Sequence, residues 1–355
     1  MMQRADVWVL LGPHRGDNNQ LLALADGLQR PYRTIQMGYR WFGHLPAVFR
    51  SATLAGLDAE ARSEIVPPWP SLVLGIGQRS VPVARYIQNE TRARTKIIRL
   101  GDPMVSHSLF DLVITTTQYA VRDADNVIRL PITITSQDDA KPTRMEERWL
   151  STFARPRRLL VIGGKTSLWR FDEHLLVTTI QKLQQRAKIE GGSVIAVTSP
   201  RTSPVVAAAA QEALGETGLV INSFPRYSIL LKAADEIHVT GDSVSMVSDA
   251  VASGKPVGVI RLEPDRLARF VQFVGDVRGR PFRMRDLEKF WDDLDARGLV
   301  GTVEEPRCGA LDVIPTQMAI EAVLATLNDR VPDLSPSRYE SLDGALPAAP
   351  KPVAL

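Results

Sequence analysis

The sequence predicts an α/β protein made of two domains, each a parallel sheet covered by helices. Short apolar strands alternate with helical segments along the chain, which argues against an all-β or all-α fold. A length of 355 residues favours two domains of ordinary size. A polar, proline-bearing stretch divides them, and the last residues are rich in Pro, Ala and Ser. We therefore expect an N-terminal domain at 1–140, a linker with one short helix at 141–157, a C-terminal domain at 158–330 and a disordered tail at 331–355.

The N-terminal domain begins with the buried-type strand DVWVLL, residues 6–11, which leads through a glycine-containing turn into a helix, LLALADGL. The same order of strand, glycine turn and helix recurs over residues 69–90. Further strands are expected at 96–103, 110–116 and 126–131, so this domain should contain one parallel sheet.

Polar side chains follow three of these strands, at the edge where open α/β sheets bind ligands. Gln78, Arg79 and Ser80 open the second helix and would suit a phosphate group. Asp102 follows the strand at 96–103, although such an acid can also be a simple turn or cap residue. In the first turn, GPHRGDNNQ, glycines allow close approach of the backbone to a ligand, and the candidate ligand-binding residues are Gly12, His14, Arg15, Gly16, Asp17 and Asn18.

The C-terminal domain carries a second set of polar residues to one sheet edge. The strand at 158–162 is followed by Gly163, Gly164 and Lys165, which can cradle a phosphate although the spacing of a Walker loop is missing. The strand SVIAVT leads into Ser199, Arg201 and Thr202, and the segment Asn222–Tyr227 follows a further strand at 218–224. Helices are expected at about 172–189, in PRYSILLKAAD and at 315–328, the last of which could return to the first domain.

The most informative stretch is VTGDSVSMVSDAVASGKPVGVI, residues 239–260. A strand turns sharply at Thr240–Asp242 and a helix opens at Ser243, which either Asp242 or Ser243 could cap. Free amides at a helix start, here those of Val244, Ser245 and Met246, form an anion site, and serine hydroxyls add donors. Asp249 lies about two turns in, a spacing that suits the phosphates and ribose of a nucleotide. The alternative is a well-capped helix of an ordinary doubly wound sheet.

The segment GDSVSMVSDAVASGKPV resembles the signature of the family named after a plant mitochondrial-fission protein, whose bacterial members are grouped with lipooligosaccharide outer-core glycosyltransferases. Its V-S-D-A and G-K-P parts are also similar to the donor-site helix of GT-B-type sugar transferases. The family resemblance covers most of residues 6–300.

This resemblance implies two Rossmann-like domains of the GT-B type that face each other across a cleft. It implies that Asp249 holds the ribose of a nucleotide sugar. We also expect the donor to contact Gly163–Lys165, Ser199, Arg201, Thr202 and Asp242–Met246, because the C-terminal strands bring these residues to one edge. The N-terminal loop and Gln78–Ser80 would bind the acceptor. The sequence departs from the family in having Asp17 where a histidine is common.

Sugar transfer needs a general base for the acceptor hydroxyl. Asp17 is our first candidate, Asp102 the second and His14 the third. We expect no metal and no cofactor besides the nucleoside-diphosphate sugar, because H-E-x-x-H, paired-cysteine and D-x-D motifs are absent from the sequence. The leaving diphosphate would be stabilised by the helix start and by Lys165 or Arg201.

Two other functions stay open. The chain could be a non-catalytic recruiting module, as the plant division factor suggests, or a nucleotide-sugar epimerase. Binding of a nucleoside-diphosphate sugar would exclude the recruiting module. An epimerase would release free sugar or an altered donor without any acceptor.

Composition and charge indicate where the protein acts. One cysteine, Cys308, suits a reducing cytoplasm, and the sequence contains no apolar run of about 18 residues that would span a membrane. The net charge of +3 and the lack of a basic-aromatic module give no reason to expect nucleic acid. Segment 37–57 mixes Tyr39, Trp41, Phe42 and Phe49 with Arg40 and Arg50. It predicts peripheral contact with the inner face of the membrane and a lipid-linked acceptor, unless these aromatics pack inward.

Overall fold

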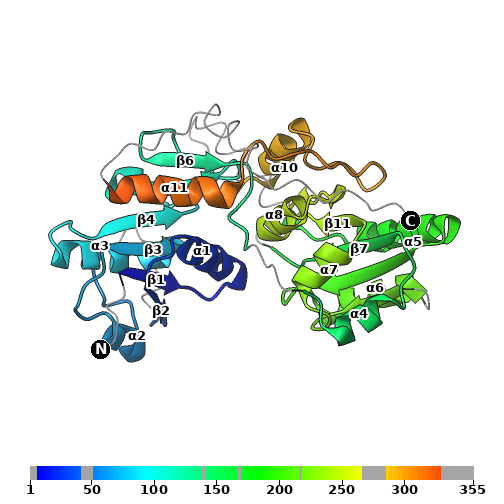
Figure 1. Ribbon diagram of the computed structural model, residues 1–355, viewed down its shortest axis with the longest axis horizontal. Helices are drawn as coiled ribbons and strands as arrows, with labels where there is room; N and C mark the ends of the chain where they lie inside the picture. Colours follow the sequence, from blue (N-terminus) through cyan, green and yellow to red (C-terminus); the bar gives the residue numbers. More distant parts are fainter. Residues whose placement is uncertain are drawn as a thin grey trace, which may run out of the picture.

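A computed structural model describes residues 6–40, 51–136, 141–166, 169–215, 218–265 and 285–328. Within these residues the chain forms one six-stranded sheet, one five-stranded sheet and a two-stranded ribbon. Every pair of neighbouring strands in the two large sheets is parallel. The two sheets and their helices lie side by side as separate bodies (Figure 1). The predicted fold class, two doubly wound α/β domains, is confirmed.

The N-terminal sheet has the strand order β2-β1-β3-β4-β5-β6. Its strands are β1 (Val7–Leu11), β2 (Tyr32–Gln36), β3 (Leu72–Ile76), β4 (Lys96–Leu100), β5 (Leu112–Thr116) and β6 (Val127–Leu130). Its helices are α1 (Arg15–Gly27), α2 (Ala59–Glu64), α3 (Val81–Glu90) and the 3₁₀ turns η3 (Gln78–Ser80) and η4 (His107–Leu109). Helix α1 starts several residues earlier than LLALADGL suggested, so Arg15, Gly16, Asp17 and Asn18 lie in its first turn rather than in a loop.

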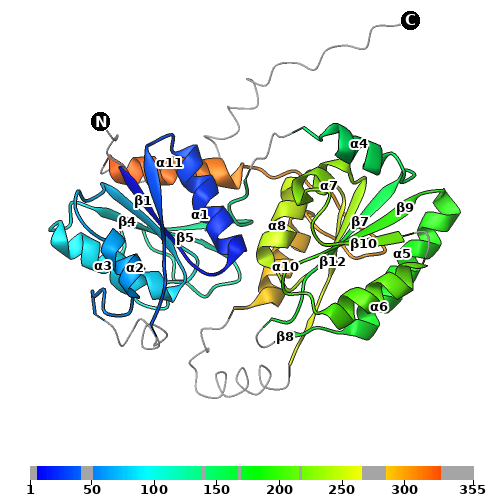
Figure 2. The ribbon, with the colours of Figure 1, turned by 90° about the horizontal axis from the view of Figure 1, so that it is seen from below.

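Helices cover both faces of this sheet. One face packs against α1 and α11 (Pro315–Leu327), whose residues share one apolar cluster with Val7, Leu74 and Ile98. The other face packs against α2 and α3, around the nearly buried Trp8. Helix α11, drawn in orange, therefore returns from the end of the described chain to lie along the N-terminal domain, beside α1 (Figure 2).

The C-terminal sheet has the strand order β10-β9-β7-β11-β12. Its strands are β7 (Arg157–Ile162), β9 (Ser193–Thr198), β10 (Gly218–Ile221), β11 (Glu236–Thr240) and β12 (Val257–Ile260), and β8 (Trp169–Arg170) pairs with β13 (Glu263–Pro264) beside it. Its helices are α4 (Arg144–Leu150), α5 (Glu173–Glu190), α6 (Pro204–Leu214), α7 (Tyr227–Ala233), α8 (Val244–Ala252) and α10 (Leu287–Ala296). Residues of α7, α8 and α10 pack on one face, whereas α5 and α6 pack on the other.

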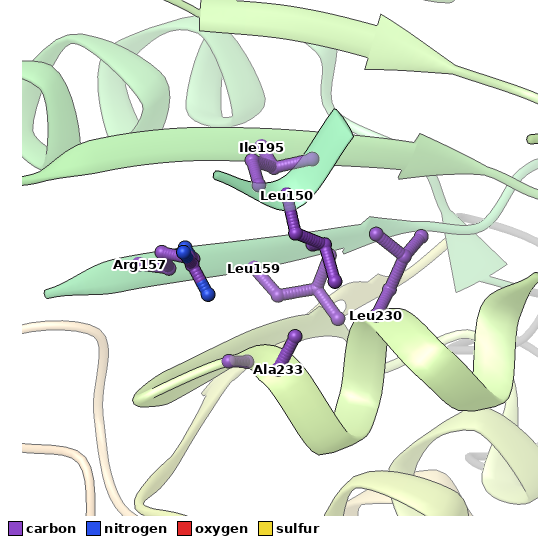
Figure 3. A pocket seen from close by; sticks show the side chains of 7 residues that line it. Leu150, Arg157, Leu159, Ile195, Leu230 and Ala233 are labelled. Carbon is purple, nitrogen blue, oxygen red and sulfur yellow. The ribbon is translucent and has the colours of Figure 1, made fainter. Parts of the chain in front are cut away.

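The core of the C-terminal domain is well filled. Leu150, Leu159, Ile195 and Leu230 surround a cavity of about 10 Å³, with Arg157 at its edge (Figure 3). A space of that size holds at most one water molecule. It is therefore a packing defect between α4, α7 and the sheet, and no ligand site.

Strand order locates where a ligand can bind. In each sheet, two neighbouring strands lead to connections that run toward opposite edges of the sheet. These strands are β1 and β3 in the N-terminal sheet and β7 and β11 in the C-terminal sheet. Crevices at such switch points, beyond the carboxyl ends of the strands, are the usual ligand sites of open α/β sheets. Most of the polar residues singled out in the sequence lie in the turns after β1, β3, β7 and β11, whereas Asp102 follows β4 and Ser199–Thr202 follow β9.

Candidate functional site

The first turns of α1 and α8 meet between the domains. A Cβ atom built on Gly16 would lie 2.9 Å from the Ser245 hydroxyl oxygen, so glycine fits this contact with least displacement. Both views show α1 and α8 next to each other across the domain boundary (Figures 1 and 2). Residues from the two predicted sets are thus brought together at two helix starts.

The predicted cap of α8 is wrong. Ser243 occupies the N-cap position, but its side chain accepts no backbone amide of the helix. The fully buried Asp242 carboxylate instead accepts from the Thr240 hydroxyl at 2.6 Å, from the Gly164 amide at 3.1 Å and from the Arg201 guanidinium at 2.6 Å. The first backbone bond of the helix is from the Val247 amide to the Ser243 carbonyl at 3.0 Å. The amides before it, those of Val244, Ser245 and Met246, therefore stay available to a ligand.

The glycines after β7 have a different role from the predicted one. The Gly163 amide donates to the Thr240 hydroxyl at 2.8 Å, and the Gly164 amide is held by Asp242. A Cβ on Gly163 would lie 2.1 Å from the Asp242 carboxylate, and one on Gly164 would lie 2.0 Å from the Arg201 carbonyl oxygen. These glycines are needed because protein groups approach them closely, and their amides cannot also cradle a phosphate. Lys165 follows them and is exposed.

The turn after β9 is held by its own hydroxyls. The Thr202 hydroxyl accepts from the Ser199 amide at 3.0 Å and lies 2.6 Å from the Gly163 carbonyl, to which it donates. Arg201 is ion-paired with Asp242 but remains partly exposed. This turn therefore fixes the loop after β7 beside the start of α8.

Asp249 and Tyr227 lie near enough for the carboxyl to affect the pKa of the phenol, and neither side chain forms a hydrogen bond within the described residues. Desolvation raises the pKa of the Asp249 carboxyl to about 7. The Tyr227 hydroxyl is buried without a hydrogen-bond partner in the described part of the chain, and the neighbouring Asp249 contributes to its raised pKa. A carboxylate and a phenol with free hydrogen-bonding capacity are suited to a polyhydroxyl ligand.

On the N-terminal side, Asp17 lies among cations. Partial burial raises the pKa of the Asp17 carboxyl, while His14, Arg285 and Arg99 act to lower it. The Arg99 side chain at the end of β4 is buried, and desolvation lowers its pKa to about 10, so it remains charged at neutral pH. Tyr119, which follows β5, is close enough to Asp17, Arg99 and Arg285 for their charges to shift its raised pKa. We call Asp17, Arg99, Tyr119 and Arg285 the Arg99 cluster.

Other predicted N-terminal residues hold this cluster in place. The Asn18 side chain forms two hydrogen bonds with Gly12. Its Oδ1 accepts from the Gly12 N–H and its Nδ2 donates to the Gly12 carbonyl, both at 2.9 Å. Ser80 is buried and its hydroxyl accepts from Arg99 Nη1 at 2.7 Å. Asp102 accepts from the Met104 amide at 2.7 Å and so holds a turn beside the cluster.

The remaining predicted residues are more peripheral. His14 and Arg15 are exposed at the start of α1. Gln78 is partly exposed in η3, and the Arg79 guanidinium lies over the Tyr39 ring, 5.7 Å from its centroid. Trp41, Phe42, Phe49 and Arg50 lie outside the described residues, as does the tail at 331–355.

Arg99, Tyr119 and Arg285 were not predicted as site residues. The signal for Arg99 was present, because it is a single charged residue in the otherwise apolar interior of the strand KIIRL. Tyr119 and Arg285 come from loops whose meeting depends on the fold. Arg285 Nε donates to the Gln118 side chain at 2.6 Å, and the Asp286 amide donates to the Gln118 carbonyl at 2.9 Å. A further bond joins the domains, from the Thr133 amide to the buried Ser248 hydroxyl at 3.0 Å.

Across the described ranges, no cluster of three or more His, Cys, Asp or Glu side chains could hold a metal ion. Of the helices that the structure describes, none is long and apolar enough to cross a membrane.

Two facing Rossmann-like domains, with polar groups at the switch point of each sheet, define a protein of the GT-B fold class. The solved structure of a candidate UDP-N-acetylglucosamine 2-epimerase from Listeria monocytogenes is similar, with a TM-score of 0.50 and 13% identity, over 93% of this chain and 99% of that one. UGT2 of Phytolacca americana, solved with UDP-2fluoro-glucose and pterostilbene, gives a TM-score of 0.42 and 10% identity, over 84% of this chain and 91% of that one.

Sequence comparison identifies the family. Residues 15–298 match the family described as mitochondrial fission ELM1, and the chain belongs to this family. An uncharacterised protein of Rickettsia prowazekii (strain Madrid E) is 21% identical over 295 residues, which cover 71% of this chain and 82% of that protein. The resemblance noted in the sequence is therefore confirmed.

Proposed function

We propose that this protein is a glycosyltransferase that moves a sugar from a nucleoside-diphosphate sugar to an acceptor hydroxyl. The observation that carries the proposal is the arrangement of α8. Its first turn presents unbonded amides, and Asp249 further along it is a desolvated carboxylate without a hydrogen-bond partner in the described chain. An anion-binding helix start followed by a free carboxylate suits the diphosphate and ribose of one nucleotide.

On the donor side, the amides of Val244, Ser245 and Met246 would bind the diphosphate, with hydroxyls from Ser243 and Ser245. The two hydroxyl oxygens lie 3.2 Å apart and can act together on one phosphate. Asp249 and Tyr227 would bind the ribose hydroxyls. Lys165, which is exposed beside this turn, would add a positive charge to the leaving diphosphate.

The transfer step requires a base on the opposite side of the cleft. Asp17 lies next to Gly16, which meets Ser245 at the start of α8. In the proposed step Asp17 takes the proton of the acceptor hydroxyl, the hydroxyl oxygen forms the new bond to the anomeric carbon, and the bond from that carbon to the phosphate oxygen breaks. The nucleoside diphosphate leaves as an anion stabilised by the α8 amides. Its raised pKa makes Asp17 a stronger base than an ordinary aspartate.

We further propose that the acceptor is a lipid-linked or lipooligosaccharide-type saccharide, and that the protein acts at the inner face of the cytoplasmic membrane. Support for this comes from the family resemblance and from the aromatic and arginine-rich sequence 37–57. Residues 41–50 of that segment lie outside the described structure.

An epimerase acting on a nucleotide sugar is the second candidate, favoured by the similarity of fold to the Listeria structure. Incubating the protein with a nucleotide sugar, with and without an acceptor, distinguishes the two activities. A transferase releases nucleoside diphosphate only when an acceptor is present, whereas an epimerase alters the donor or releases free sugar without one.

The donor site is tested by Ser243→Asp, which places a negative charge at the start of α8. We expect uridine or guanosine diphosphate to raise the Tm of the wild-type protein and to leave that of the variant unchanged. Asp292→Asn, at an exposed position of α10 that is ion-paired with Arg261, is the control for a single change of surface charge and should keep the nucleotide effect. Equal stabilisation of wild type and a folded Ser243→Asp protein would refute the site.

A further inference from the structure

The Arg99 side chain is a buried cation with unused hydrogen-bond donors. Arg99 is 1% exposed and donates one N–H, from Nη1, to the Ser80 hydroxyl at 2.7 Å. Its Nε and Nη2 atoms are buried and have no partner in the described part of the chain. Guanidinium groups of this kind are normally satisfied by a carboxylate or phosphate, since a buried charge without one is costly.

A comparison with the second buried arginine shows what Arg99 lacks. Arg158, also 1% exposed, forms ion pairs with Glu190 and Glu236 at the opposite end of the C-terminal sheet. Arg99 makes no ion pair with any described carboxylate, although Asp17 and Asp102 are near enough to affect its pKa. Among the described residues, no acid forms an ion pair with Arg99 as Glu190 does with Arg158.

A second cation lies at the same place. Arg285 is exposed, and its Nε is bonded to the neutral side chain of Gln118 at 2.6 Å. The charges of Arg285 and Arg99 both act on Asp17 and on Tyr119, so the two arginines lie near the same pair of side chains. An anion there would interact with both arginines and would lie beside the candidate base.

We propose that the Arg99 cluster binds an anionic group of the acceptor, a phosphate or a carboxylate, next to the hydroxyl that receives the sugar. The anion accepts from Nε and Nη2 of Arg99 and from Arg285, while Tyr119 borders the site. The inference rests on the proposed function, because only that function makes this side of the cleft an acceptor site. It adds the chemical class of the acceptor, which must carry a negative charge close to its reacting hydroxyl.

The test measures anion binding when the donor site is closed. In the Ser243→Asp background, inorganic phosphate, glucose 6-phosphate and glucuronate are titrated by calorimetry, with glucose as the neutral control. We expect the anions to bind and glucose not to bind. The phosphate and glucuronate arms show which anion the site prefers. Arg99→Gln and Arg285→Gln should each weaken anion binding by about 10- to 100-fold, the loss of a charged hydrogen bond.

Two controls separate binding from folding. Arg158→Gln removes a buried arginine far from the cleft and should leave the anion affinity unchanged. If Arg99→Gln does not fold, Arg285→Gln alone tests whether the cluster binds the anion, because the Arg285 side chain is exposed and its loss should not affect folding. Asp17→Asn removes the one negative charge of the cluster and should strengthen anion binding several-fold.

The outcomes are distinct. If Ser243→Asp still binds nucleotide, the donor site of the proposed function is refuted. Anion binding at Arg99 can then be measured in the wild-type protein with saturating nucleotide. If no anion binds, or if binding is the same in Arg285→Gln and in the parent, the free donors of Arg99 are bonded to water alone and the proposal is wrong.

Discussion

In the proposed donor site, Asp249 is the residue that would bind the ribose. Burial without a partner raises its pKa to about 7, which means that the folded protein keeps a proton that an unfolded chain loses at its ordinary pKa of 3.8. The stability contributed by neutral Asp249 is therefore present below pH 3.8 and decreases as the pH rises to about 7. A ribose that donates two hydroxyls to the ionised carboxylate would provide the hydrogen bonds that the ligand-free protein lacks.

We predict that nucleoside diphosphate affinity rises with pH across the titration of Asp249. Only the ionised carboxylate can accept from both ribose hydroxyls, so the affinity should increase by about tenfold from pH 6 to pH 8. Asp249→Asn should weaken binding at pH 8 by about 1–3 kcal/mol and flatten this pH profile. Calorimetric titrations at both pH values measure the effect, and the variant corrects for ionisation of the nucleotide itself.

A 2′,3′-dideoxy nucleotide provides the matching change in the ligand. In the wild-type protein, the dideoxy nucleotide should bind more weakly than the normal nucleotide by the same factor that Asp249→Asn causes. In the Asp249→Asn variant, the two nucleotides should bind equally well. Additive losses would mean that Asp249 and the ribose do not contact each other.

The turn between β11 and α8 is set by close packing as well as by the Asp242 bonds. A Cβ on Gly241 would lie 2.5 Å from the ring of Trp291 in α10, which is fully buried. Because the ring has no room to move, overpacking should displace the start of α8.

Gly241→Ala is therefore expected to reduce the free energy of unfolding by about 1–3 kcal/mol and to weaken nucleotide binding. Gly12→Ala is the matched control, since a Cβ there meets no atom within 4 Å, and its stability should stay close to wild type. Urea unfolding of the two variants measures the difference. Equal stability would show that the ring yields without cost and that Gly241 does not fix α8.

Helices and strands could be predicted from the sequence where glycine or proline delimits an apolar run. The glycine at 254 and the proline at 256 indicate, from the sequence alone, the end of α8 and the start of β12. Strand β2 was missed, since only Ile35 of its five residues is buried and the apolar signal is weak. The cap of α8 could not be predicted, because the partners of Asp242 come from Gly164 and Arg201, far away in the chain.

The same limit applies to the site as a whole. Asp249 and Ser243–Ser245 could be identified because they belong to one local segment with a recognisable pattern. The Arg99 cluster combines residues that follow or end β4 and β5 with Arg285 before α10, and no local pattern joins them. The one available signal was Arg99, a lone arginine inside an apolar strand. It becomes significant only when the fold shows that helices cover both faces of the sheet and bury it.

At the scale of the whole molecule, we propose that transfer occurs where α1 and α8 meet, with the donor on one domain and the base on the other. The chain passes between the domains more than once, between β6 and α4 and again between α10 and α11, which lies on the N-terminal sheet. The Thr133–Ser248 and Arg285–Gln118 bonds hold the two sides of the site against each other. Binding of donor and catalysis of transfer should therefore depend on different domains.

The most direct test compares the wild type with Asp17→Asn in an assay of nucleoside diphosphate release from a nucleotide sugar with acceptor, alongside a titration of the donor. We predict that Asp17→Asn binds the donor with wild-type affinity but loses about 10²- to 10⁴-fold in transfer rate, the usual contribution of a general base. Unchanged transfer by a folded Asp17→Asn protein would contradict it.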